Sequence, residues 1–194
     1  DLTDEEIESF LELIEGALGT YERIESMPEP SRGPVPENRD SGHRPDEDED
    51  PFNAFVTRCR VKEADGGPLA GYDFGVKDNI SVAGVEMTCG TEVMEGYVPE
   101  RDATAVRRVL EAGGTVVGKT NMSTMAVSGT GELTATGPVL NPRNPEYLAG
   151  GSSSGSAVAV VQGDVDVAIS TDQAGSIRVP AAWSGCVGHK PTHG

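Results

Sequence analysis

The stretch AGGSSSGSAVAVVQG, residues 149–163, places two glycines before three consecutive serines and a run of small apolar residues. The apolar run predicts a helix over residues 153–163, because serine hydroxyls can bond the first free amides and Gly163 suits a helix end. The same serines suit catalysis, either as a nucleophile or as a proton relay. The stretch alone leaves the helix cap and the catalytic roles open, so the flanking sequence has to decide.

Short β-type runs alternate with helical segments from Phe52 onward. This alternation predicts an α/β fold in which helices cover the faces of a sheet. The predicted strands are LAGYDFGVK (69–77), TVVGKT (115–120) and VDVAIST (165–171), and the predicted helices are RDATAVRRVLEAGG (101–114), SSGSAVAVVQG (153–163) and SIRVPAAWSG (176–185).

Two segments precede this core, which spans residues 52–194. Residues 1–27 predict a helix that opens with a capping box between Thr3 and Glu6. The apolar face of this helix is expected to pack against another apolar surface, either that of the core or that of a second copy of the chain. Residues 28–51 are acidic and rich in Pro and Gly, which predicts an exposed linker in which His43 is a poor general base. The apolar face consists of Ile7, Phe10, Leu11, Ile14 and Leu18.

Composition narrows the possible partners. The 32 acidic and 15 basic residues give a net charge of −17, which disfavours nucleic acid and suggests a surface adapted to high salt. No apolar run is long enough to cross a membrane. The three cysteines and three histidines show neither a disulfide framework nor metal-ligand spacing, so we expect a cytoplasmic protein without metal or cofactor.

Two short motifs suggest other functions. GGTVVGKT, residues 113–120, fits the phosphate-loop pattern through Gly113, Gly118, Lys119 and Thr120. A phosphate loop follows a strand and opens a helix, whereas here a helix precedes and β-branched residues occupy the loop positions. Nucleotide binding is therefore disfavoured.

GSSSG, residues 151–155, matches the elbow motif that would make Ser153 the nucleophile of a hydrolase. In hydrolases with this motif, the turn that carries the nucleophile follows a β-strand. The segment before it in this chain, LNPRNPEYLAG (residues 140–150), is instead predicted to be a loop. Only His189 and His193 follow as possible bases, so a Ser-His-Asp enzyme would need partners from outside this sequence.

Ser176 lies in a more favourable position. It follows a predicted strand and a glycine-containing turn and opens a helix with Pro180 near its first turn. Backbone amides and the positive end of the helix dipole can stabilise an oxyanion there.

Four motifs, in this order, resemble the amidase signature family across residues 52–194: GVKDNI (75–80), GKTNM (118–122), NPRNPEYLAGGSSSGSAVAVVQG (141–163) and STDQAGSIRVPAAWSGCVGHKPT (170–192). The resemblance implies an α/β/α fold with a mixed central sheet. It also implies hydrolysis of carboxamides by a Ser, cis-Ser, Lys triad. Because the family's chains run well beyond this sequence, only the N-terminal portion of the fold is expected.

Residue by residue, the resemblance makes Ser176 the nucleophile, Ser152 the cis-serine that relays a proton, and Lys77 the base. Burial that lowers the pKa of a lysine gives such a base a physical cause. The oxyanion and substrate-binding residues would be Gln173, Ala174, Gly175 and Ser153, with Asp172 and Arg178 pairing to hold the turn. Many relatives carry Gly in place of Ala174, so a positive φ there would strain this chain.

Among amidases, the sequence looks more like stand-alone enzymes of the nitrile-degrading type, which implies a small amide substrate and a homodimer involving the N-terminal helix. Two alternatives remain open. The chain can be the A subunit of a glutamine-dependent tRNA amidotransferase, or a non-catalytic scaffold of the same fold.

Overall fold

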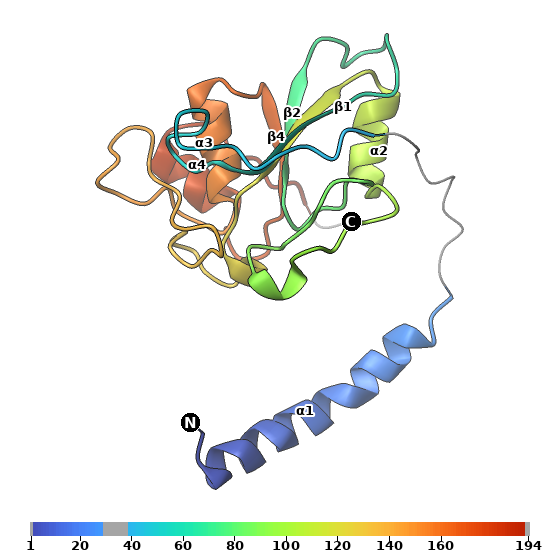
Figure 1. Ribbon diagram of the computed structural model, residues 1–194, viewed down its shortest axis with the longest axis vertical. Helices are drawn as coiled ribbons and strands as arrows, with labels where there is room; N and C mark the ends of the chain where they lie inside the picture. Colours follow the sequence, from blue (N-terminus) through green and yellow to red (C-terminus); the bar gives the residue numbers. More distant parts are fainter. Residues whose placement is uncertain (1, 29–38, 193–194) are drawn as a thin grey trace. The chain divides into compact units, whose positions relative to one another are not determined.

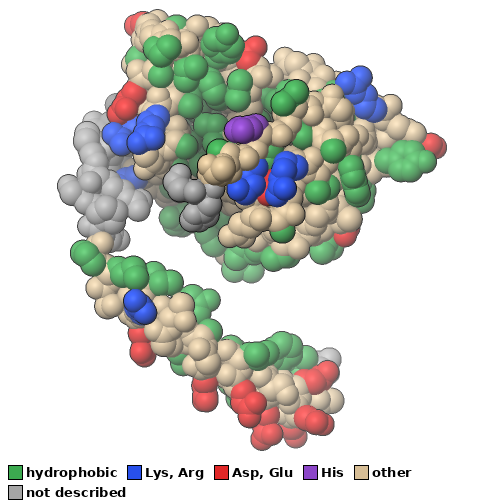
Figure 2. Space-filling model, turned by 180° about the vertical axis from the view of Figure 1, so that it is seen from behind, with side chains coloured by type: hydrophobic (Ala, Val, Ile, Leu, Met, Phe, Trp, Pro, Cys, Tyr) green, Lys and Arg blue, Asp and Glu red, His purple; other side chains and the backbone are tan. Residues whose placement is uncertain are grey.

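The computed structural model describes residues 2–28 and 39–192 of the chain. The chain divides into two compact units, residues 1–33 and 34–194. The first unit holds helix α1 (Asp4–Glu25), whose predicted capping box is present: the Glu6 amide donates to Thr3 Oγ1 and the Thr3 amide donates to the Glu6 carboxylate. Apolar side chains run along one side of α1 and acidic ones along the other (Figure 2), and the helix has no buried residue.

The second unit is built on a four-stranded mixed sheet (Figure 1). Its strands are β1 (Phe55–Val61), β2 (Asp73–Lys77), β3 (Thr115–Thr120) and β4 (Val167–Ile169), in the order β1-β3-β2-β4. The three predicted strands are parallel, and the antiparallel partner is β1, which pairs with β3. The predicted α/β class and mixed sheet are therefore confirmed.

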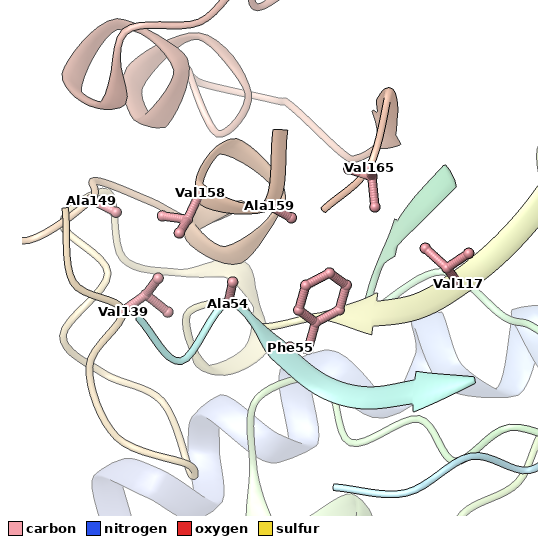
Figure 3. Close-up of a cluster of buried hydrophobic side chains, with 8 residues drawn as sticks. All are labelled: Ala54, Phe55, Val117, Val139, Ala149, Val158, Ala159 and Val165. Carbon is pink, nitrogen blue, oxygen red and sulfur yellow. The ribbon is translucent and has the colours of Figure 1, made fainter. Parts of the chain in front are cut away.

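Helices cover both faces of the sheet. Adjacent residues of β3 point to opposite sides, so Val116 belongs to one hydrophobic cluster and Val117 to the other. Helix α2 (Thr104–Glu111) buries Val106 and Leu110 in the cluster around Val116. Helix α3 (Ser154–Gln162) lies against the other face, in the cluster shown in Figure 3, and α4 (Arg178–Ser184) packs on α3. Two short 3-10 turns, Glu92–Met94 and Thr124–Ala126, lie in the connecting loops.

Helix α3 approaches the sheet very closely at its first turn. A side chain on Gly155 would place its Cβ 2.1 Å from the carbonyl oxygen of Ala54 and 2.5 Å from the amide nitrogen of Asn121. The Gly155 amide donates to the Asn121 carbonyl at 3.0 Å. This contact holds the start of α3, and the serines before it, at the carboxyl ends of β2 and β3.

The segment GGTVVGKT does not form a phosphate loop. Residues 115–120 are strand β3, all of them buried, and Lys119 Nζ lies 2.8 Å from Asp78 Oδ1 with neither side chain exposed. Nucleotide binding at this motif is thereby ruled out, because its lysine is neutralised inside the core.

The described part of the acidic segment lies along the core. Arg39 pairs with Asp102, and the carboxylate of Asp50 accepts from the amides of Ala54 and Phe55 at the start of β1. His43 is exposed and contacts Glu49. Residues 29–38 of the predicted linker lie outside the described residues. None of the described helices is long and apolar enough to cross a membrane, and the described residues hold no cluster of metal-ligating side chains.

Candidate active site

Lys77 and Ser152, two of the predicted site residues, are in direct contact. Lys77 ends β2, is fully buried, and places its Nζ 2.7 Å from Ser152 Oγ. The same Nζ lies 3.0 Å from Thr171 Oγ1 and 3.5 Å from the Thr171 carbonyl oxygen. Thr171 follows β4, which runs parallel to β2, so the carboxyl ends of the two strands meet here.

The glycine directly before Ser152, Gly151, has a steric cause. A Cβ on Gly151 would lie 2.7 Å from Ser123 Oγ and 2.8 Å from the Ser128 carbonyl oxygen. The peptide bond between Gly151 and Ser152 is cis, and the Ser152 carbonyl accepts from the Ser123 amide at 3.0 Å. Packing and main-chain hydrogen bonds thus hold the buried Ser152 hydroxyl against Lys77.

Burial lowers the pKa of Lys77 to about 8, because the charged form loses its hydration, while the negative charge of Asp172 partly opposes this shift. A lysine whose pKa lies this close to neutrality is a competent proton acceptor. The residue predicted as the base therefore has the electrostatic environment that a base requires.

Asp172 holds the turn that leads into α4. Its carboxylate oxygens accept from the amides of Gly175, Ile177 and Arg178 at 2.8 to 3.2 Å. They also accept from the Arg178 guanidinium at 2.9 and 3.0 Å. Arg178, followed by the backbone amides, keeps the pKa of this fully buried carboxyl well below its ordinary range. The predicted pair of Asp172 and Arg178 is confirmed, and it closes the turn.

One of the predicted oxyanion donors is already engaged: the Gly175 amide donates to Asp172 Oδ1 at 2.8 Å, so its prediction as a donor is wrong. The amides of Gln173, Ala174 and Ser176 remain the candidate donors. Gln173 and Ala174 are exposed. The described residues with positive φ other than glycine do not include Ala174, so an alanine fits at this position without backbone strain.

Ser176 contacts the serine stretch of residues 152–154 through its main chain. Its carbonyl accepts from the Ser153 amide at 3.1 Å, which puts the turn beside the serine stretch, and the residue is half-buried. Ser153 precedes α3 after a loop, as expected, and its hydroxyl donates to the Thr171 carbonyl at 3.3 Å. A hydroxyl used in this way, with no strand leading into it, does not fit an elbow nucleophile.

Sequence reasoning missed several polar neighbours of Lys77. Asn79 Nδ2 lies 3.1 Å from Thr171 Oγ1, and Thr171 is the residue that contacts Lys77. Asp78 bridges Lys119 and the turn at Thr88, whose amide and hydroxyl donate to Asp78 Oδ2. The available signal was position alone, since Asp78 and Asn79 directly follow Lys77 and Thr171 directly precedes Asp172.

Known proteins with similar sequences include amidases and A subunits of amidotransferases. The chain is 51% identical to the A subunit of glutamyl-tRNA(Gln) amidotransferase from Natronomonas pharaonis over 73% of its own length and 34% of that protein's. It is 42% identical to an enantioselective amidase of Rhodococcus rhodochrous over 100% of its own length and 37% of that protein's. The chain thus spans about a third of the curated relatives it matches.

Solved structures agree with this relationship. The A subunit of glutamyl-tRNA(Gln) amidotransferase from Thermotoga maritima is 40% identical, with a TM-score of 0.70 over 75% of this chain and 32% of its own. The peptide amidase of Stenotrophomonas maltophilia is 44% identical, with a TM-score of 0.62 over 65% of this chain and 27% of its own. The model of the family named Amidase matches residues 54–194, so the chain belongs to the amidase family.

Proposed function

We propose that this chain carries the catalytic residues of an amidase that hydrolyses a carboxamide to a carboxylic acid and ammonia. One observation carries the proposal: a fully buried lysine whose pKa is lowered to about 8 lies 2.7 Å from the hydroxyl of a buried serine. A lysine in water has a pKa near 10.4 and is a poor proton acceptor at neutral pH. The burial of Lys77 lowers its pKa and so makes it a better proton acceptor at neutral pH.

In the proposed reaction, Ser176 Oγ attacks the amide carbonyl carbon and passes its proton to Ser152, which passes its own to Lys77. The oxyanion accepts hydrogen bonds from the candidate donors of the turn, the amides of Gln173, Ala174 and Ser176. The proton then returns through Ser152 to the leaving nitrogen, the carbon–nitrogen bond breaks, and ammonia departs from an acyl-Ser176 ester. Water hydrolyses this ester by the same relay and releases the acid.

We propose a stand-alone amidase with a small amide substrate, acting in the cytoplasm. The alignment with the enantioselective amidase supports this choice because it extends over the whole chain, N-terminal helix included, whereas that with the Natronomonas pharaonis protein covers 73% of the chain. The N-terminal segment, residues 1–27, is further proposed to bring two copies together through the apolar face of α1, with residues 28–51 as the linker and 52–194 as the amidase core.

Covalent labelling tests the proposed nucleophile. The purified protein is treated with a serine-directed fluorophosphonate, and the adduct is located by peptide mass spectrometry. We expect labelling at Ser176, about 100-fold slower or worse in Lys77→Ala, which removes the base, and in Ser152→Ala, which removes the proton relay. Lys62→Ala, on the surface, serves as the control and should label normally. An adduct at Ser153, or no adduct in folded protein, contradicts the proposal.

The sequence identities favour a second candidate, the A subunit of an amidotransferase, because three proteins named as that subunit are 49 to 51% identical to this chain. Such a protein should release little ammonia alone and much more with its partner subunits, whereas a stand-alone amidase should turn over simple amides without them. Ammonia release measured with and without partner subunits from a related organism separates the two candidates.

A further inference from the structure

The contacts of the Lys77 amine can serve both of its protonation states. Among the described residues, its Nζ has three oxygen neighbours, Ser152 Oγ at 2.7 Å, Thr171 Oγ1 at 3.0 Å and the Thr171 carbonyl oxygen at 3.5 Å, which suit the three N–H groups of the ammonium form. A neutral amine has two N–H groups and one lone pair. If the two N–H groups point at the two oxygens of Thr171, the lone pair is left for the proton of Ser152.

This arrangement requires the Thr171 hydroxyl to act as an acceptor toward Lys77, and Asn79 favours that state. Asn79 Nδ2 donates to Thr171 Oγ1 at 3.1 Å, which is shorter than the 3.5 Å contact in which Thr171 Oγ1 would donate to Asn79 Oδ1. The amide therefore donates to the hydroxyl oxygen and occupies one of its two lone pairs, and Lys77 donates to the other. Asn79 lies two residues beyond Lys77 in the same segment.

We propose that Asn79 and Thr171 are positioning residues that direct the lone pair of Lys77 at the hydroxyl of Ser152. The proposal rests on the proposed function, since it concerns the base of that reaction. Neither residue touches the substrate or the reacting carbonyl in this scheme. Both act by holding the amine in the orientation that accepts a proton.

The charged groups around Lys77 set the direction of each expected effect. Asp172 is the anion that raises the pKa of Lys77 against the larger effect of burial, and Arg178 pairs with it. Asp78, the next residue along the chain, is neutralised by Lys119. Removing an acceptor of the ammonium should lower the pH midpoint of the reaction, and adding a negative charge should raise it.

The test is the pH profile of fluorophosphonate labelling at Ser176, compared by its midpoint and by its plateau rate. Thr171→Val keeps the side-chain shape but removes the hydroxyl. We expect its midpoint about one pH unit lower, since a hydrogen bond to a charged group is lost. Its plateau should be about 10-fold lower, because the lone pair is no longer directed. Thr171→Ser retains the hydroxyl and should restore both values.

Asn79→Asp gives the opposite sign, because a carboxylate at this position stabilises the ammonium form of Lys77. We expect the midpoint about one pH unit higher than in the unmodified protein. The matched control is Asn144→Asp, an exposed asparagine far from Lys77 in sequence, which should leave the midpoint unchanged.

Each outcome decides the matter. Midpoints that move in opposite directions for Thr171→Val and Asn79→Asp, with recovery in Thr171→Ser, support the positioning role. Normal labelling with unmoved midpoints in these variants, or loss of the Thr171→Val plateau without recovery in Thr171→Ser, overturns it. Absence of any Ser176 labelling in the unmodified protein overturns the proposed function itself, so the two failures are distinguishable.

Discussion

At the scale of single residues, the buried Lys77 is predicted to lower stability when it is charged. Its pKa falls from 10.5 to about 8 on folding, so below pH 8 the fold contains a buried charge that the unfolded chain keeps hydrated. As pH rises from 8 toward 10.5, the folded state releases its proton first, and this penalty disappears. We expect the free energy of unfolding to rise by about 2 to 3 kcal/mol between pH 7 and pH 10, relative to Lys77→Met.

Urea denaturation of both proteins at the two pH values measures this difference, and other titrating groups cancel in the comparison. A difference between the two proteins that stays constant with pH would show that Lys77 has no lowered pKa.

The buried pair of Lys119 and Asp78 gives a second prediction at this scale. Neither side chain is exposed, so Lys119→Met leaves a carboxylate in the core without its counter-charge. We expect a loss of about 3 to 5 kcal/mol in the free energy of unfolding, partly recovered when Asp78→Asn is added. The control is Lys62→Met, which breaks an exposed pair with Asp65 and should change stability by about 1 kcal/mol or less. Equal losses in the free energy of unfolding for Lys119→Met and Lys62→Met would contradict the prediction.

At the scale of elements, helix α3 requires a glycine at position 155 to pack against the sheet, whereas helix α1 has no such requirement at Gly16. A Cβ at Gly155 would overlap the main chain of Ala54, whereas a Cβ at Gly16 in α1 meets nothing within 4 Å. We expect Gly155→Ala to lower the free energy of unfolding by about 3 kcal/mol or more and to slow labelling at Ser176, because the serine stretch moves with α3.

The matched variant Gly16→Ala should have the opposite effect on its own helix. Alanine in an exposed helix interior is favoured over glycine by about 0.5 to 1 kcal/mol, so the helix content by circular dichroism should rise. Tolerance of Gly155→Ala in both stability and labelling would mean that α3 does not need its close contact with the sheet.

At the scale of the whole molecule, the net charge of −17 predicts a dependence on salt. Raising the ionic strength from about 0.1 M to about 1 M shortens the screening length from roughly 10 Å to roughly 3 Å, which reduces self-repulsion among the acidic groups. We expect the melting temperature to rise over this range. The rise should be smaller in a triple variant, Glu92→Gln, Glu95→Gln and Glu100→Gln, which removes three exposed charges. Equal melting temperatures at low and high salt would contradict the prediction that the acidic surface is adapted to high salt.

Much of this protein was determined by its sequence alone. Periodicity and glycine positions predicted helices α1 to α4 and the three parallel strands, because these signals act between near neighbours in the chain. The capping box of Thr3 and Glu6 and the pair of Asp172 and Arg178 were predicted for the same reason, since each joins residues three to six positions apart. The motifs around Lys77 and Ser152 identified the family and proposed both as site residues.

Other features were decided only by the tertiary structure. Strand β1 was not among the predicted strands, and it pairs antiparallel with β3 through contacts such as Phe55 with Thr120, which no local pattern in FVTRCRV reveals. The same holds for the surroundings of Lys77. Thr171 and Asn79 are separated by 92 positions, yet they meet because parallel strands bring their carboxyl ends to one edge of the sheet. The sequence supplies a lysine, and only the packing of distant segments removes its water and lowers its pKa.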